Sequence, residues 1–314
     1  MPGSDALTVR VEAARWEAES VTSFEFVSPT GQDLPIWEPG AHIDVYLPSG
    51  AVRQYSLCGD PADRTRYRIA VLELRGGRGG SVEAHRELRC GRIIDIGLPR
   101  SNFKLVDADR YVFVAGGIGI TPILPMIREV DSRGIKWELV YGARSAAHFA
   151  FKGELPSDAV RFVAQDTDGL IDIGDVVDNA SGAAVYCCGP PALTDALIDS
   201  MNRVGRGRDL HLERFGPAPT RSDTPGNSEI ELARSGLVVS VPPDQSVLEA
   251  VRAAGVECPS SCEMGICGTC ETSVLAGEVD HRDSLLTEQE RTSGASMLIC
   301  VSRAKGGGRL VLDI

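Results

Sequence analysis

Four cysteines in the last third of the chain constrain its fold more than any other feature. Cys262, Cys267 and Cys270 have the spacing C-x4-C-x2-C, and Cys300 follows after 29 intervening residues. This is the plant-type spacing for a 2Fe-2S cluster, which needs four thiolates, three from one loop and one from a nearby strand. Small residues in the loop let backbone N–H groups approach the sulfur atoms. The alternative is zinc, although structural zinc usually takes two separated C-x2-C pairs and this chain has only one.

The charge balance of the 314 residues disfavours two classes of partner. With 32 Lys/Arg against 44 Asp/Glu the net charge is −12, so we expect binding neither to nucleic acid nor to an anionic membrane surface. The sequence has no run of 18 apolar residues that could span a membrane. Residues 1–20 lack the basic and apolar regions of a secretory signal. We therefore expect a cytoplasmic protein, and we expect it to be monomeric.

The other cysteines and the histidines carry weaker signals. A cytoplasmic setting keeps thiols reduced, so the nine cysteines favour metal ligation over disulfides. Cys58, Cys90 and Cys187 are expected to be buried as small hydrophobic residues. The five histidines show no metal-ligand spacing. His85 and His281 lie in charged runs, and we expect both to face solvent.

The first hundred residues have the pattern of a small β-barrel. Short segments with alternating apolar residues, such as 43–47 and 67–74, are separated by turn signals rich in Pro and Gly. One helix is expected here, with Ser81 as its N-terminal cap. We assign residues 1–103 to this domain.

The middle of the chain changes to an alternating pattern. Strand-like runs alternate with helical segments at 122–134 and 192–205. This alternation predicts a parallel, doubly wound sheet in a second domain, 104–222.

A segment rich in Pro, Gly, Ser and Thr, 216–228, is the predicted linker to the last domain. In this domain, 229–314, we expect a hairpin, a short helix capped by Ser246 and ended by Gly255, the cysteine loop and late strands.

The cysteine loop also carries a family resemblance. The segment PSSCEMGICGTCE (259–271), with Cys300 in LICVSRAK, resembles the ferredoxin domain of the phthalate dioxygenase reductase family, which includes vanillate demethylase reductases. The resemblance extends from about Leu7 to Ile314, with the other two modules in the expected order. It implies a multidomain α/β and β fold: a flavin-binding antiparallel β-barrel, a doubly wound α/β nicotinamide domain and a β-grasp ferredoxin domain.

Two elements of the first domain match the family's flavin site. In RQYSLCG (53–59), an Arg fork suits a phosphate, a Tyr ring can pack on isoalloxazine, and a Ser hydroxyl or N–H can lie near flavin N5. GGRGGS (76–81) leads into a helix whose N-terminus favours the flavin phosphate. The alternative is a mobile hairpin loop beside a Tyr in the core. The expected flavin-binding residues are Arg53, Gln54, Tyr55, Ser56, Gly79, Gly80 and Ser81.

The choice between FMN and FAD comes from the resemblance. Members with a C-terminal ferredoxin domain resemble FMN enzymes, so FMN is expected, whereas the residues by themselves leave FAD open.

Two turns of the second domain match the family's nicotinamide site. VAGGIGITP (114–122) lets a dinucleotide approach the backbone, and CCGPPAL (187–193) follows a strand and opens a helix. Arg144 could receive a 2′-phosphate, but the family uses NADH, which we expect here. A buried structural role is the alternative for Cys188. The expected residues are Gly116, Gly117, Gly119, Thr121, Cys188, Gly189 and Pro190.

Phe215, in LERFG, corresponds to the place where relatives have an aromatic residue near the flavin face. Such a ring can shield the isoalloxazine until the nicotinamide displaces it. The alternative is ordinary core packing at the end of a strand.

Together these sites predict an NADH-dependent flavin/iron-sulfur oxidoreductase. Electrons would pass from NADH to FMN, then to the 2Fe-2S cluster, then to a partner oxygenase of the Rieske aromatic-ring dioxygenase or demethylase type in aromatic catabolism. Ser56, Cys188 and Phe215 are the expected catalytic residues. The alternatives are a reductase for a haem monooxygenase and a non-enzymatic flavin/iron-sulfur redox sensor.

Overall fold

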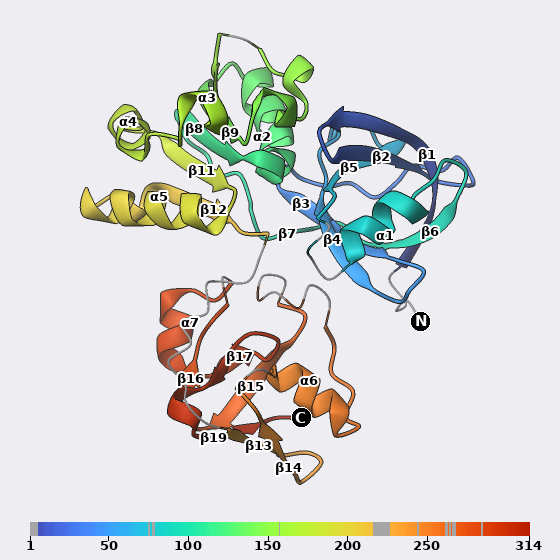
Figure 1. Ribbon diagram of the computed structural model, residues 1–314, viewed down its shortest axis with the longest axis vertical. Helices are drawn as coiled ribbons and strands as arrows, with labels where there is room; N and C mark the ends of the chain where they lie inside the picture. Colours follow the sequence, from blue (N-terminus) through green and yellow to red (C-terminus); the bar gives the residue numbers. More distant parts are fainter. Residues whose placement is uncertain are drawn as a thin grey trace. The chain divides into compact units, whose positions relative to one another are not determined.

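The computed structural model describes residues 6–74, 76, 79–156, 158–215, 227–243, 245–260, 263, 265, 268–283 and 285–314. The chain divides into two compact units, Met1–Glu213 and Arg214–Ile314 (Figure 1). Most of the predicted linker, residues 216–226, lies outside the described residues. No helix in the described part of the chain is long and apolar enough to cross a membrane.

The first sheet of the Met1–Glu213 unit is antiparallel, as predicted. Its main path runs β4-β3-β6-β1-β2-β5, and β7 pairs with β3. Its strands are β1 (Ala6–Ala18), β2 (Val21–Val27), β3 (Ala41–Tyr46), β4 (Val52–Ser56), β5 (Arg66–Leu72), β6 (Ile93–Gly97) and β7 (Arg100–Ser101).

The two ends of this sheet meet, so the sheet curls into a barrel. Leu57, directly after β4, forms an antiparallel bridge with Ile69 on β5. The Cys58 N–H then donates to the Arg68 carbonyl at 2.8 Å. Alternate residues point inward and fill the barrel, since a strand presents every second side chain to one face. Val9 and Val11 are fully buried in this way.

Helix α1 (Gly80–Glu87) lies against this sheet, but the predicted cap is wrong. Gly79 occupies the N-cap position with φ 80°, a left-handed conformation that glycine adopts readily. Ser81 is already inside the first turn, and its hydroxyl accepts the Leu74 N–H at 3.0 Å. Ser81 therefore fixes the preceding loop to the helix instead of capping the helix itself.

The second sheet of this unit is parallel, with the order β10-β9-β8-β11-β12, and confirms the doubly wound prediction. Its strands are β8 (Arg110–Gly116), β9 (Lys136–Ala143), β10 (Val160–Ala164), β11 (Ala184–Cys188) and β12 (Leu210–Glu213). The connecting helices are α2 (Ile120–Ser132), α3 (Gln165–Asp168), α4 (Ile173–Asn179) and α5 (Pro191–Arg203). The strand order reverses between β8 and β11, which is where ligands bind in sheets of this type.

The Arg214–Ile314 unit has a mixed sheet with the order β14-β13-β19-β15-β17 and a separate β16-β18 pair (Figure 1). Its strands are β13 (Ser228–Leu232), β14 (Leu237–Val241), β15 (Glu271–Ala276), β16 (Val279–Asp280), β17 (Ser296–Leu298), β18 (Arg303–Ala304) and β19 (Arg309–Leu312). Its helices are α6 (Val247–Ala253) and α7 (Glu288–Ser293). β13 and β14 form the predicted hairpin.

The core of this unit forms where α6 covers the sheet. Val247, Leu248 and Val251 of α6 are buried with residues of β13, β17 and β19. Ser246 caps α6 through a full capping box with Glu249, as predicted, and Gly255 follows the helix with φ 83°. A mixed sheet covered by one helix is the β-grasp arrangement, so the predicted multidomain α/β and β fold class is confirmed.

Candidate functional site

The two predicted flavin elements meet, although they lie more than 20 residues apart in the sequence. Arg53 on β4 lies directly against Gly80 at the start of α1, where an added Cβ would overlap Arg53 Nε. Arg53 Nη1 donates to the Val52 carbonyl at 2.8 Å, which orients the guanidinium. A side chain at position 80 would occupy the space between the Arg53 guanidinium and the start of α1. The guanidinium and the helix start therefore form a site that fits a phosphate.

Tyr55 and Gln54, the next two residues of β4, lie in different surroundings. Tyr55 packs against the barrel core, and burial raises the pKa of its hydroxyl to about 12, so the ring stays neutral. Gln54 donates its amide N–H to Asp44 Oδ1 at 3.0 Å. The Gln54 side chain is thus held by a neighbouring carboxylate, whereas Arg53 faces the helix start.

Ser56 ends β4 in a buried position beside a residue that the sequence did not single out. The Ser56 hydroxyl and Glu213 Oε2 are both buried and near each other, and neither makes a hydrogen bond of good geometry with the described residues. Burial raises the pKa of the Glu213 carboxyl to about 8, and the nearby Ser56 hydroxyl offsets part of this rise. Buried polar atoms without partners are rare in folded proteins. This pair therefore fits a bound group that offers hydrogen-bond partners, as a flavin edge does.

The two predicted nicotinamide turns also touch. An added Cβ at Gly116 would lie 2.6 Å from Pro190 Cδ and 3.2 Å from Gly189 Cα. An added Cβ at Gly119 would overlap the Cys188 carbonyl. Only glycine permits this approach, which brings the ends of β8 and β11 together at the reversal of strand order.

The polar groups of these turns are fixed by local contacts. Thr121, near the start of α2, donates its hydroxyl to the Ile118 carbonyl at 2.9 Å. Cys188 ends β11 in register with Glu213 on β12. Burial, with a further contribution from Glu213, raises the pKa of the Cys188 thiol well above its ordinary value. Cys188 is therefore a neutral thiol at pH 7.

Glu213 is the residue that sequence reasoning missed. It lies in the LERFG segment, and a charged residue at the end of a strand is ordinarily expected to face solvent. The pairing of β12 with β11 places it beside Cys188, and the tertiary fold brings Ser56 of β4 next to it. Phe215 follows two residues later and is half-buried, but it belongs to the second unit, so its role at the flavin stays a prediction.

A network of charged groups joins the barrel to the parallel sheet. Glu154, in the short 3-10 turn Lys152–Glu154, accepts from Arg68 of β5 at 2.7 and 2.8 Å and from Arg128 of α2. Both arginines also donate to the Cys58 carbonyl, at 2.9 and 3.1 Å, and Arg128 donates to the Gly59 carbonyl at 2.7 Å. Burial alone would raise the pKa of Glu154, but the two guanidinium groups outweigh it and lower this pKa. Hydrogen bonds therefore connect the chain just beyond Ser56 to α2, the helix that begins within the predicted nicotinamide turn.

Two of the four predicted cluster ligands, Cys262 and Cys267, lie outside the described residues. Cys270 and Cys300 are both buried in the second unit. Gly268, between the second and third cysteines of the motif, has φ 75°, and an added Cβ there would lie 2.9 Å from Leu285 Cδ2. Glycine at this position therefore lets the backbone lie close to Leu285.

Three of the weaker predictions are wrong. Cys90 is exposed, whereas Cys58 and Cys187 are buried as expected. His85 is half-buried, with Nε2 2.9 Å from the Val71 carbonyl. The His281 side chain is only 9% exposed, with Nδ1 3.6 Å from Asp283 Oδ1. A charged sequence neighbourhood does not decide burial: His85 contacts Val71 on β5, whereas His281 is buried beside Asp283, only two residues away.

Known proteins resemble this chain over nearly its whole length. A family model for the 2Fe-2S iron-sulfur cluster binding domain matches residues 230–305. The phthalate dioxygenase reductase of Burkholderia cepacia is 39% identical, covering 98% of this chain and 97% of that protein.

Two solved structures share the fold. A phthalate dioxygenase reductase, described as a modular structure for electron transfer from pyridine nucleotides to 2Fe-2S, has a TM-score of 0.76 and 38% identity, covering 98% of each chain. An intact type IV self-sufficient cytochrome P450 monooxygenase has a TM-score of 0.82 and 41% identity, covering 98% of this chain and 41% of that longer one. With these identities over nearly its full length, the chain belongs to the phthalate dioxygenase reductase family.

Proposed function

We propose that this protein is an NADH-dependent reductase that passes electrons through FMN and a 2Fe-2S cluster to a partner oxygenase. One observation carries the proposal. Ser56 of the flavin motif and Cys188 of the nicotinamide turn both lie beside Glu213, although they are distant in the sequence. A flavin and a nicotinamide held by these two elements would therefore share one buried site, as hydride transfer between them requires.

The chain's own residues bind and orient the flavin. Arg53, Gly79, Gly80 and the Ser81 backbone would hold the phosphate at the start of α1, and Tyr55 and Ser56 would contact the ring. Gln54 contributes by fixing β4 through Asp44. Bound flavin accepts a two-electron hydride and supplies electrons one at a time to a 2Fe-2S acceptor.

The nicotinamide would lie on the two glycine turns. Gly116, Gly117 and Gly119 expose the backbone, and Thr121 fixes the start of α2. Cys188, Gly189 and Pro190 would orient the nicotinamide ring, with Phe215 displaced from the flavin face as it binds. Arg144 is exposed at the end of β9 and remains the residue through which NADPH would be accommodated.

The cluster would be held by Cys262, Cys267, Cys270 and Cys300 in the Arg214–Ile314 unit. We assign the chain to three functional modules, 1–103, 104–222 and 229–314. The first boundary falls between β7 and β8, inside one compact unit. The modular description of the phthalate dioxygenase reductase structure supports this division.

We further propose that the acceptor is a Rieske-type oxygenase, and that the protein works as a monomer in the cytoplasm. The likeness to phthalate dioxygenase reductase supports a Rieske acceptor. The match to a self-sufficient cytochrome P450 supports a haem monooxygenase as the second candidate. Reduced cysteines dedicated to a cluster fit the cytoplasm.

The experiment that tests the electron order uses Cys300→Ser. Loss of one ligand should abolish NADH-driven reduction of cytochrome c, which needs the cluster, and spare that of ferricyanide, which the flavin can reduce directly. Metal and sulfide analysis of the parent protein comes first, and zinc without iron would overturn the cluster assignment. If both activities vanish in the variant while flavin stays bound, the proposed order of carriers is wrong.

A further inference from the structure

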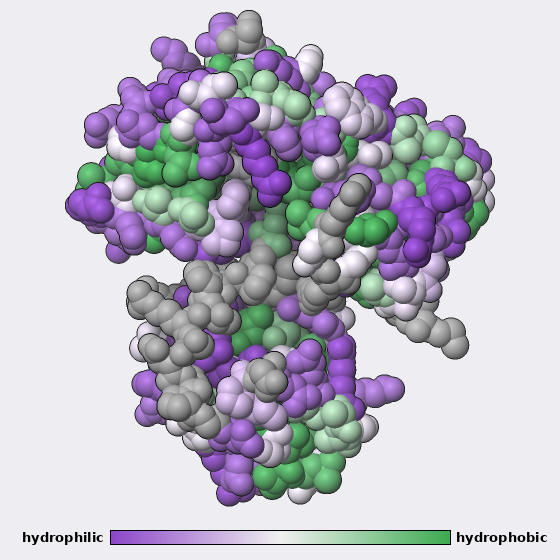
Figure 2. All heavy atoms as spheres, in the orientation of Figure 1, coloured by the Kyte–Doolittle hydropathy of each residue, from purple (hydrophilic) through white to green (hydrophobic). Residues whose placement is uncertain are grey.

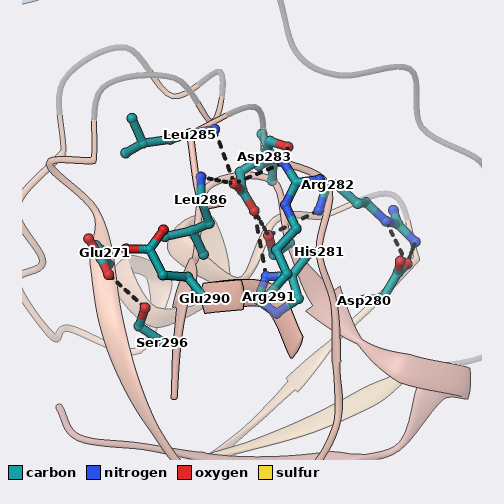
Figure 3. Close-up of polar contacts among 12 residues, drawn as sticks. Glu271, Asp280, His281, Arg282, Asp283, Leu285, Leu286, Glu290, Arg291 and Ser296 are labelled. Carbon is teal, nitrogen blue, oxygen red and sulfur yellow. Dashed lines mark hydrogen bonds and ion pairs between the residues drawn. The ribbon is translucent and has the colours of Figure 1, made fainter. Parts of the chain in front are cut away.

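A buried carboxylate lies beside the cluster loop and has no role in the proposed electron path. The Asp283 carboxylate is 3% exposed, and its Oδ2 accepts the Leu285 N–H at 3.1 Å and the Leu286 N–H at 2.8 Å. Arg291 Nη2 lies 3.6 Å from the same oxygen and donates to the Asp283 carbonyl at 2.7 Å. Figure 3 shows Arg291 of α7, and Leu285 and Leu286 of the segment directly after Asp283, converging on the Asp283 carboxylate. The carboxylate is therefore fixed in one orientation.

Its other oxygen faces the turn after β17 that carries the fourth cysteine. The hydroxyl of Ser302, two residues beyond Cys300 and fully buried, donates to Asp283 Oδ1 at 3.5 Å and accepts the Arg282 N–H at 3.2 Å. His281 Nδ1 lies 3.6 Å from the same Asp283 oxygen. Asp283 thus connects its own segment to the Cys300 segment.

The Asp283 segment also packs directly on the cysteine loop. At Gly265, where φ is 74°, an added Cβ would lie 3.0 Å from Asp283 Cα and 3.3 Å from Asp283 Cβ. At Gly268 an added Cβ would meet Leu285 Cδ2. Gly265 lies between Cys262 and Cys267, and Gly268 between Cys267 and Cys270. One short segment therefore supports both intervals of the loop.

We propose that Asp283 is a positioning residue for the cluster: it fixes the three-cysteine loop against the turn that carries Cys300, and its buried negative charge lowers the reduction potential of the cluster. The inference rests on the proposed 2Fe-2S site. Adding an electron beside a buried carboxylate is unfavourable, because two like charges interact strongly at low dielectric. Arg291 reduces this effect only in part, since its side chain is 39% exposed.

The test is Asp283→Asn, which keeps the shape and removes the charge. The equilibrium constant for cluster reduction should rise about tenfold, which is about 59 mV for a one-electron couple, in a potentiometric titration followed by electron paramagnetic resonance. The visible circular dichroism of the cluster should change, and chelator-driven cluster loss should speed up several-fold. Asp280→Asn is the matched control. Asp280 lies three residues before Asp283, pairs with Arg282 and is 33% exposed. The control should leave all three quantities unchanged.

Every outcome separates this inference from the proposed function. If the parent protein lacks iron and sulfide, the proposed function fails. If the parent holds the cluster and Asp283→Asn lowers only the melting temperature, with potential and dichroism unchanged, Asp283 is merely structural and the inference is overturned. If Asp283→Asn does not fold, Arg291→Gln decides. It leaves the carboxylate without its counter-charge and should lower the potential, so an unchanged or higher value would overturn the inference.

Discussion

Among single residues, Glu213 gives the clearest expectation, because its folded and unfolded states hold a proton differently. Its folded pKa of about 8 lies above the ordinary value of 4.5. The folded state therefore binds more protons than the unfolded chain between these values, and stability falls as pH rises through this window. Below about pH 4.5 both states are protonated and the effect disappears.

Glu213→Gln should remove this dependence. We expect the melting temperature of the variant to exceed that of the parent by an amount that grows from pH 5 to pH 8, at roughly 2–4 °C per kcal/mol. Thermal unfolding of the holoprotein at several pH values measures it. Glu138→Gln is the control, since Glu138 pairs with Arg110 at the surface. A pH-independent difference for Glu213→Gln would contradict the raised pKa.

Secondary-structure elements meet at the start of α1, and Gly80→Ala tests this contact. Alanine favours a helix over glycine by about 0.8–1.0 kcal/mol, so the helix itself should not suffer. The new Cβ must instead displace Arg53. We expect the dissociation constant of FMN, measured by fluorescence titration of the stripped protein, to rise about tenfold or more, as for loss of one charge-assisted hydrogen bond.

Gly76→Ala is the matched control in the same glycine-rich loop, because an added Cβ there meets nothing within 4 Å. Equal effects of the two substitutions would mean that general loop stiffening, and not the Arg53 contact, decides flavin affinity.

The Glu154 network links β5, α2 and the chain beyond β4, so it should set how the flavin and nicotinamide elements face each other. Glu154→Gln loses the paired contact with Arg68. Small misplacements in hydride-transfer geometry are costly, and we expect flavin reduction by NADH in stopped flow to slow about 10- to 100-fold while flavin stays bound. Glu129 lies on α2 and pairs with Arg133 at the surface, so Glu129→Gln should leave the rate of flavin reduction unchanged. If Glu154→Gln has a normal rate of flavin reduction and a lowered melting temperature, the network contributes to stability alone.

For the molecule as a whole, we expect charge to influence the rate of encounter with its acceptor. Residues 228–314 carry 13 Asp/Glu against 7 Lys/Arg. Among the described residues, six of these seven cations form ion pairs, so the acidic excess lies on other carboxylates, among them the exposed Glu229, Glu257 and Glu271. Figure 2 shows hydrophilic side chains interspersed with hydrophobic ones on the visible surface of this unit. Such a field would attract a basic surface on the oxygenase.

Reduction of the cognate oxygenase should therefore slow as salt rises through about 0.1 M, where the Debye length is about 10 Å. Ferricyanide reduction by the flavin should change less and serves as the internal control. Glu257→Gln with Glu271→Gln should flatten the salt dependence. A flat profile in the parent protein would leave the acidic surface a role in solubility alone.

The sequence by itself determined the local elements and the chemistry of the ligands. The C-x4-C-x2-C spacing, the R-x-Y-S strand and the Ser246 capping box depend on residues within a few positions of each other, and such patterns survive in any arrangement of the elements. The alternation of strands and helices likewise indicated the parallel sheet, because only crossover connections join parallel strands.

Only the tertiary structure decided what surrounds each residue. The Glu213 carboxylate lies beside Cys188 because β12 pairs with β11, and its Oε2 is buried next to Ser56 of the barrel. Asp283 was enclosed by Ser302 and Arg291, and His281 was buried rather than solvated. Ser81 lost its expected cap to Gly79, since the left-handed turn before α1 needs a residue without a side chain. The surroundings of Glu213 and Asp283 depend on contacts between distant parts of the chain, and burial of a charged group follows from those contacts and not from its neighbours in sequence.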